Sequence, residues 1–149
     1  MNRICKSCDE ICNQCENSPK NCTECAGIRY LSNFDCIYVC PSPFYGSPIT
    51  NECLSNCPDN YFMYDIDRTC YLTCPIGYYG NVITRMCVDL CPDGMYADQV
   101  TSRCQYCDFN CSTCVYTSSN CLSCKYSWLN GASCQEIISI YIFLKSFLN

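Results

Sequence analysis

Apolar residues other than Cys stand far apart along most of this chain, in a pattern that predicts short hairpins rather than helices. In the central region each of four Cys-Pro pairs is followed by an aromatic five positions after its Cys and a β-branched aliphatic nine positions after it. The aromatics are Tyr45, Phe62, Tyr79 and Tyr96, and the aliphatics are Ile49, Ile66, Ile83 and Val100. Turn formers such as Gly46-Ser47-Pro48 and Gly80-Asn81 lie between them. Each unit is therefore predicted to be an irregular β-hairpin whose aromatic lies on the aliphatic of the opposite arm.

The cysteines divide the chain into repeats. From Cys36 to Cys104, gaps of four and thirteen residues alternate, which gives a period of 17. A second pattern flanks this region, because six cysteines from Cys5 to Cys25 recur 99 positions later. We therefore expect a four-Cys module plus loop at 5–36, four 17-residue Cys-Pro fingers at 36–104, a second four-Cys module at 104–134, and an apolar tail at 135–149 outside the repeats.

The composition indicates that crosslinks replace a hydrophobic core. Cys makes up 21 of the 149 residues, which is above the roughly 8–10% typical of disulfide scaffolds. Leu, Ile, Val and Phe together supply only 23 of residues 1–136, too few for an ordinary packed domain. The predicted fold class is small and disulfide-rich: an elongated rod of stacked short β-hairpin modules with little helix and no large hydrophobic core.

The charged residues exclude several functions. The chain has nine basic residues, fourteen acidic residues and no His, for a net charge of −5. No basic run or stripe is present, so the electrostatic signature of a nucleic-acid binder is missing. The lack of His excludes Ser–His and Cys–His catalysis and mixed Cys/His zinc sites. We expect no enzymatic activity, no cofactor and no nucleic-acid partner.

So many cysteines predict either disulfides or metal. In an oxidising compartment they form a disulfide framework. A tetrathiolate zinc site could use Cys5 and Cys8 with Cys22 and Cys25, although another CxxC pair interrupts that spacing. A thioredoxin-like redox site would need a βαβ context that is not visible. Disulfides without a bound metal are the favoured interpretation, and an intracellular zinc-binding protein is the alternative.

Spacing alone does not determine which cysteines pair. One consistent hypothesis closes each Cys-Pro loop on itself and pairs each four-Cys module first with third and second with fourth. It gives Cys8–Cys15, Cys12–Cys22, Cys25–Cys36, Cys40–Cys53, Cys57–Cys70, Cys74–Cys87, Cys91–Cys104, Cys107–Cys114, Cys111–Cys121 and Cys124–Cys134. Cys5 remains unpaired. Its counterpart Cys104 closes a loop opened thirteen residues earlier, so we expect the partner of Cys5 to lie before Met1, with a free or intermolecular Cys5 as the rival.

A known family shares this arrangement. The run Cys-x2-Cys-x3-Cys-x2-Cys-x6-Cys-x2-Cys-x10-Cys-x3-Cys-Pro from Cys5 to Pro41 resembles furin-like cysteine-rich repeats, of the superfamily found in the insulin and epidermal growth factor receptors. The units at 36–104 are similar to the single-disulfide fingers of those regions. The resemblance covers residues 5–134 and implies the interleaved pairing of the four-Cys modules. The Tyr- and Asn-rich filler looks most like that of protist cysteine-rich surface proteins, which implies binding and spacing roles.

Two further features are candidates for modification or ligand binding. Asn21-Cys22-Thr23 and Asn110-Cys111-Ser112 fit the N-glycosylation pattern. Asp65 and Asp67 could suggest calcium, but they lack an EF-hand spacing, so solvated turn residues are the favoured interpretation.

Both ends of the sequence suggest a fragment. Met1 leads almost directly into Cys5, without the apolar stretch of a signal peptide. Residues 137–148 are strongly apolar but shorter than the roughly 20 residues that span a bilayer. We expect this tail to be either the start of a truncated membrane segment or a gene-boundary artefact.

The sequence thus predicts a non-catalytic extracellular repeat region that reaches the cell surface by the secretory pathway. It would act as a spacer or as a stalk that binds a protein or surface ligand, with membrane attachment through the C-terminal segment as a candidate.

Overall fold

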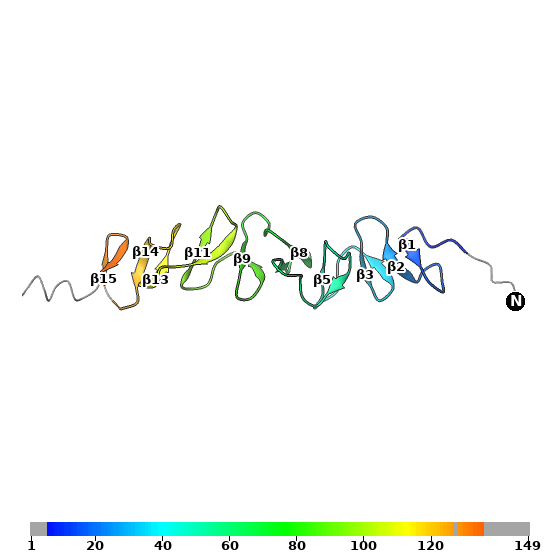
Figure 1. Ribbon diagram of the computed structural model, residues 1–149, viewed down its shortest axis with the longest axis horizontal. Helices are drawn as coiled ribbons and strands as arrows, with labels where there is room; N and C mark the ends of the chain where they lie inside the picture. The colour runs from blue at the N-terminus through cyan, green and yellow to red at the C-terminus, as the bar shows by residue number, and fades with distance from the viewer. Residues whose placement is uncertain (1–5, 127, 136–149) are drawn as a thin grey trace, which may run out of the picture. The chain divides into compact units, whose positions relative to one another are not determined.

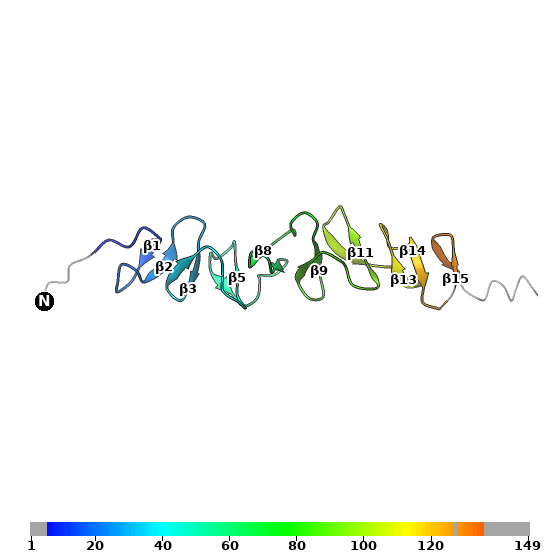
Figure 2. The ribbon, with the colours of Figure 1, turned by 180° about the vertical axis from the view of Figure 1, so that it is seen from behind.

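The computed structural model describes residues 6–126 and 128–135. These residues form sixteen strands of two to four residues, and no helix occurs among them (Figure 1). The strands are arranged as a succession of small hairpins, which Figure 2 shows from behind. The predicted class, a disulfide-rich fold of short hairpins with little helix and no large hydrophobic core, is confirmed. The described residues form two compact units, one of 6–72 with Arg85–Cys87 and the other of the remainder.

The first unit begins with two small hairpins and continues into fingers. Strand β1 (Cys12–Cys15) pairs with β2 (Cys22–Cys25), and β3 (Tyr30–Ser32) pairs with β4 (Asp35–Ile37), both antiparallel. The first finger is formed by β5 (Tyr45–Gly46) and β6 (Cys53–Leu54), and the second by β7 (Phe62–Tyr64) and β8 (Thr69–Tyr71). Within this unit the strand order is β10-β7-β8-β5-β6, with β10 spanning Met86–Val88.

The second unit contains the same kinds of module. Its strands are β9 (Tyr79–Asn81), β11 (Met95–Asp98), β12 (Arg103–Tyr106), β13 (Cys111–Cys114), β14 (Cys121–Cys124), β15 (Trp128–Asn130) and β16 (Ser133–Gln135). The β13–β14 hairpin reproduces the bulged register of β1–β2, since Cys111 faces Cys124 as Cys12 faces Cys25. Equal cysteine spacing therefore leads to equal strand register.

At four joints, neighbouring modules are connected by one parallel residue pair, which the sequence did not predict. These pairs are Leu31 with Glu52, Gly46 with Thr69, Met63 with Met86, and Gly80 with Arg103. In each case a backbone N–H of the earlier module donates to the carbonyl two residues before the closing Cys of the later finger. The four hydrogen bonds are Leu31 to Asn51 at 2.7 Å, Gly46 to Arg68 at 2.7 Å, Met63 to Arg85 at 2.8 Å, and Gly80 to Ser102 at 2.9 Å.

The buried interior consists largely of sulfur and aromatic rings. Apart from cysteines, the buried apolar side chains in the described part of the chain are Tyr45, Phe62, Tyr64 and Met95. The aromatic Tyr45 packs with Cys57 and Cys70 of the next finger, and Tyr96 packs against the cysteines of β13 and β14. These two finger aromatics therefore lie on the disulfide of the following module.

The predicted contact between aromatic and aliphatic within one hairpin is wrong. The aliphatics at the ninth position are 60–93% exposed, at Ile49, Ile66, Ile83 and Val100. They lie within the turn at the tip of each hairpin, between its two strands. Because a single hairpin has no second layer at its tip, the aromatic buries its ring against the neighbouring crosslink instead.

Candidate functional site

The disulfides are the main chemical feature of the described residues. The structure brings together nine of the proposed pairs as S–S bonds, with Cα–Cα distances of 5.1 to 5.7 Å, inside the usual range of disulfides. These pairs are Cys8–Cys15, Cys12–Cys22, Cys25–Cys36, Cys40–Cys53, Cys57–Cys70, Cys91–Cys104, Cys107–Cys114, Cys111–Cys121 and Cys124–Cys134. Cys74 and Cys87 are also disulfide-bonded. Cys5 lies outside the described residues.

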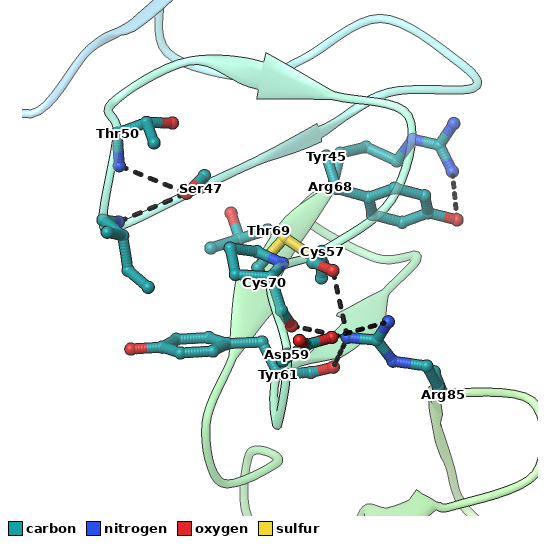
Figure 3. Close-up of a disulfide and its surroundings, with 12 residues drawn as sticks. Tyr45, Ser47, Thr50, Cys57, Asp59, Tyr61, Arg68, Thr69, Cys70 and Arg85 are labelled. Carbon is teal, nitrogen blue, oxygen red and sulfur yellow. Dashed lines mark hydrogen bonds and ion pairs between the residues drawn. A yellow bond between two sulfur atoms is a disulfide. The ribbon is translucent and has the colours of Figure 1, made fainter.

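The joint between the first two fingers is built on the Cys57–Cys70 disulfide (Figure 3). The Tyr45 ring, 7% exposed, packs on this disulfide. The Arg68 guanidinium lies over the ring, 4.5 Å from its centroid. Arg68 Nη1 donates to Asp65 Oδ1 at 2.9 Å and to Tyr45 Oη at 3.2 Å. One ring, one cation and one carboxylate therefore link residues of both fingers.

Electrostatics at this joint keep the Tyr45 hydroxyl protonated. Tyr45 Oη donates a hydrogen bond of 2.5 Å to Asp65 Oδ1. Burial of the phenol, followed by this hydrogen bond, raises the pKa of Tyr45 above its ordinary value. The Arg68 cation acts in the opposite direction on the pKa but does not reverse the shift. Tyr45 is therefore a hydrogen-bond donor at physiological pH.

Arg85 fastens the opening loop of the second finger in a different way. Its Nη2 donates to the backbone carbonyls of Cys57 at 3.0 Å, Pro58 at 2.5 Å and Tyr61 at 3.4 Å, as Figure 3 shows. The ion pair with Asp59 at 3.9 Å involves a fully exposed carboxylate, so it contributes little. The guanidinium thus binds three carbonyls of this loop, one of which, that of Pro58, also accepts from the Tyr61 N–H at 3.1 Å.

Three hairpin tips share a capping residue that the sequence reasoning did not single out. At the seventh position after the opening Cys, a side-chain oxygen accepts from backbone N–H groups of the tip. Ser47 Oγ accepts from Ile49 and Thr50 at 3.3 Å, Asn81 Oδ1 from Ile83 at 2.9 Å, and Asp98 Oδ1 from Val100 at 2.9 Å. Hydrogen bonds from Thr101 and Val100 lower the pKa of Asp98. The signal was present as Ser, Asn and Asp at one repeat position, residue types that favour such turns.

Tyr64 occupies the capping position in the second finger, and the turn that follows it contains two acidic residues, Asp65 and Asp67. Asp67 Oδ1 accepts from the Thr69 N–H at 3.1 Å, and Asp67 Oδ2 accepts from Tyr71 Oη at 2.7 Å. Both residues lie in the turn 65–68, as expected, and the Asp65 side chain is 57% exposed. Their carboxylates also accept hydrogen bonds from groups of this chain, Asp65 from Tyr45 and Arg68 and Asp67 from Thr69 and Tyr71.

The candidate glycosylation sites lie on turns of the four-Cys modules. Asn21 is half-buried, and its Nδ2 donates to the carbonyl of Glu16 at 3.0 Å. Asn110 is also half-buried, and its backbone carbonyl accepts a hydrogen bond from the Lys125 N–H at 3.0 Å. The Cys between Asn and the hydroxyl residue has 0% exposure in both sites. Use of either asparagine stays a prediction.

Three sulfur atoms gather in the second unit. The Sγ atoms of Cys111, Cys121 and Cys134 lie within 4.8 Å of one another. They belong to two disulfides, Cys111–Cys121 and Cys124–Cys134, and only reduction would make them thiolate ligands. The cysteines of the zinc alternative that the structure describes, Cys8, Cys22 and Cys25, likewise take part in disulfides.

No helix with the length and apolar character of a membrane span occurs in the described part of the chain. The apolar tail at 137–148 lies outside the described residues.

Comparison with known proteins yields one informative match. The chain is 43% identical over 49 residues, 32% of its length, to cysteine repeat modular protein 1 of Tetrahymena thermophila. The match covers 2% of that protein. No family model matches the chain. This similarity, the 17-residue period and the disulfides together show that the chain is a cysteine-rich repeat protein.

Proposed function

We propose that this chain is part of an extracellular, non-catalytic array of furin-like cysteine-rich modules that acts as a spacer and ligand-binding stalk. The observation that carries the proposal is the joint between modules. Tyr45 lies on the Cys57–Cys70 disulfide of the next finger, and a parallel residue pair adds a hydrogen bond. Such a joint can be repeated along a chain without a common core, as in other one-dimensional repeats.

The framework favours an oxidising compartment. A disulfide that closes a loop of about 14 residues stabilises by about 3 kcal/mol in the chain-entropy model. Ordering each residue costs roughly 1–2 kcal/mol of backbone entropy, and a thin module buries few side chains that could offset this cost. The contribution of the disulfide is therefore a large fraction of the net stability of the module. Reducing conditions would remove that contribution from every module. Passage through the secretory pathway supplies the oxidation that the fold needs.

The furin-like assignment and the absence of catalysis rest on the composition of the chain. The first four-Cys module and its copy have the family's spacing and interleaved connectivity. The sequence has no His, and Tyr71 and Tyr45, whose pKa values are raised, serve module joints and turns. Binding through exposed side chains and spacing by length are the functions that such an array can perform.

One experiment tests this proposal. The chain is produced in a eukaryotic secretory host, and its intact mass is measured with and without reductant after alkylation under denaturing conditions. We expect twenty cysteines to be protected from alkylation before reduction and all of them to react afterwards. Zinc is quantified in the same sample. Alkylation of most cysteines in the unreduced protein would overturn the proposal.

The close Sγ atoms of Cys111, Cys121 and Cys134 favour one second candidate, an intracellular zinc-binding protein with tetrathiolate sites. It predicts about one zinc ion for every four cysteines and free thiols after chelation. Zinc-free protein with protected cysteines would exclude it.

A further inference from the structure

The first unit contains a groove beside one of the joints between modules, and the parallel pair Leu31 and Glu52 of that joint forms part of its lining. It lies between the β3–β4 hairpin and the first finger and has a cavity volume of about 370 Å³. Phe34, Phe44, Leu31 and Pro41 supply its apolar lining, and Glu52 supplies a carboxylate. Phe34 is 57% exposed and Phe44 is 38% exposed. The volume lies within the range of roughly 300–1,000 Å³ that is typical of ligand pockets.

Phe34 stands in a backbone conformation that its side chain disfavours. The turn between β3 and β4 has two central residues with positive φ, Asn33 at 49° and Phe34 at 65°. Such turns favour Asn followed by Gly, so Asn33 fits and Phe34 replaces the expected Gly. The matching turn of β15–β16 uses Gly131 and Ala132, with positive φ only at Gly131.

Phe34 contributes little buried area to the fold, since the residue is 57% exposed. Its backbone carbonyl accepts from the Cys22 N–H at 2.9 Å, a bond that any residue could supply. The ring itself is more than half exposed. A bulky residue in the left-handed region is a backbone outlier, and such outliers cluster at functional sites. Phe34 differs from the other exposed aromatic with positive φ, Tyr116, in lining the groove.

Elsewhere in this chain, an aromatic ring next to a carboxylate is paired with a cation. At the joint between fingers, the Tyr45 ring, the Asp65 carboxylate and the Arg68 guanidinium form one cluster. The groove presents two rings and the Glu52 carboxylate, without a Lys or Arg in its lining. Glu52 forms no ion pair with any residue that the structure describes. Two other cations also lie over rings, Arg29 over Tyr38 at 4.6 Å and Lys125 over Phe109 at 5.9 Å.

We propose that this groove, here the Phe34 groove, binds an arginine side chain from an exposed segment of a partner protein. The guanidinium would stack on Phe34 and Phe44 and donate to the Glu52 carboxylate, a combination that suits Arg better than Lys because the guanidinium is planar and forked. The net charge of −5 also favours a basic partner. The inference rests on the proposed binding function and names the partner chemistry for it.

The test is a titration of the isotope-labelled chain, after its disulfides have been verified by mass. The probe is a blocked pentapeptide, Gly-Leu-Arg-Leu-Gly. Its binding is followed by NMR through the amide chemical shifts of the labelled chain. We expect saturable shifts confined to residues 31–34, 44 and 52, with a Kd below about 1 mM. The same peptide with citrulline in place of Arg should bind at least about tenfold more weakly, because it has lost the charge.

Two substitutions separate binding from folding. Phe34→Gly should weaken binding about tenfold while leaving thermal stability equal or higher, because Gly relieves the left-handed strain. Glu52→Gln should weaken binding several-fold and remove most of its salt dependence. The matched control is Tyr116→Asn. Tyr116 is another exposed aromatic with positive φ, 63°, whose repeat equivalent is Asn17, and its replacement should change the Kd less than about twofold.

Three results would overturn the proposal that the Phe34 groove binds an arginine side chain. They are the absence of saturable shifts, equal binding of the citrulline peptide, and binding of a neutral disaccharide such as maltose at these residues when the Arg peptide does not bind. An oxidised chain that fails in this way leaves the stalk proposal standing. Free thiols in the native chain would instead overturn both, because Cys25–Cys36 and Cys40–Cys53 anchor the two sides of the groove.

Discussion

At the residue scale, the position two before each closing Cys determines how modules join. Asn51, Arg68, Arg85 and Ser102 occupy it, and all four have positive φ, between 52° and 58°. This conformation lets the carbonyl accept from the preceding module. Arg is uncommon in the left-handed region. At Arg68 and Arg85 the guanidinium binds the preceding finger, which offsets the cost of the backbone conformation.

The ionisation of Tyr71 reports on the hydrogen bond between its hydroxyl and the Asp67 carboxylate. Its hydrogen bond to Asp67, together with burial, raises the pKa of Tyr71 to about 12, against about 10 for an unperturbed tyrosine. The raised pKa means that the folded chain holds this proton more tightly. The resulting stabilisation is complete below pH 10 and is lost as the pH rises towards 12.

Phenolate absorbance checks this prediction. The difference between titrations of the native chain and Tyr71→Phe should show one group ionising near pH 12. Asp67→Asn should bring that ionisation closer to 10, because it removes the carboxylate charge. A difference curve centred near 10 in the native chain would contradict the assigned hydrogen bond.

At the element scale, each hairpin is defined by a crosslink at its base and a cap at its tip. Sequence reasoning predicted the hairpins because turn formers and aromatics recur at fixed distances from the cysteines. It failed for Ile49 and its equivalents, whose apolar character suggested burial. A two-stranded hairpin can bury side chains only where another module covers it, and its tip is not covered.

Gly46→Ala tests the close approach between two hairpins. A Cβ at Gly46 would overlap Cε2 and Cζ of the Tyr30 ring and lie 2.7 Å from its Cδ2. We expect a loss of about 1–3 kcal/mol in the free energy of unfolding with disulfides intact, measured by urea denaturation. The fourth finger has Ala97 at the equivalent position, so a Cβ there is not harmful in itself.

The control for Gly46→Ala is the same change in a Tyr30→Ala background. There the substitution should cost less than about 0.5 kcal/mol, since the clashing ring is gone. Equal costs in the two backgrounds would show that the ring and Gly46 are not in contact.

At the scale of the whole molecule, stability should be distributed module by module. At the joint of the first two fingers a disulfide, an aromatic and a parallel pair meet. In the second unit a parallel pair links Gly80 with Arg103, and Tyr96 packs against the cysteines of the following module. In such one-dimensional arrays, removal of one module's crosslink affects that module and its neighbours only.

Replacement of Cys57 and Cys70 by Ser tests this expectation. The second finger should lose about 3 kcal/mol of stability, and the first finger should loosen because Tyr45 has lost its packing partner. Hydrogen exchange should show faster exchange at 40–73 and unchanged protection at 104–126. Loss of protection along the entire chain would contradict the modular account, and the matched replacement of Cys124 and Cys134 should show the opposite distribution.

What the sequence by itself determined is local. The recurrence of turn formers and cysteines predicted the hairpins. The cysteine spacing was consistent with the pairs that the structure brings together, and the resemblance to furin-like repeats implied the interleaved pairing of the four-Cys modules. Only the tertiary structure decided how one module meets the next. The joining carbonyls and the arginines that bind the preceding finger connect residues 20 to 28 positions apart, and two aromatics cover the disulfide of the next module. The backbone hydrogen bond that joins two modules involves no apolar side chain, so the hydrophobic pattern of the chain does not predict it.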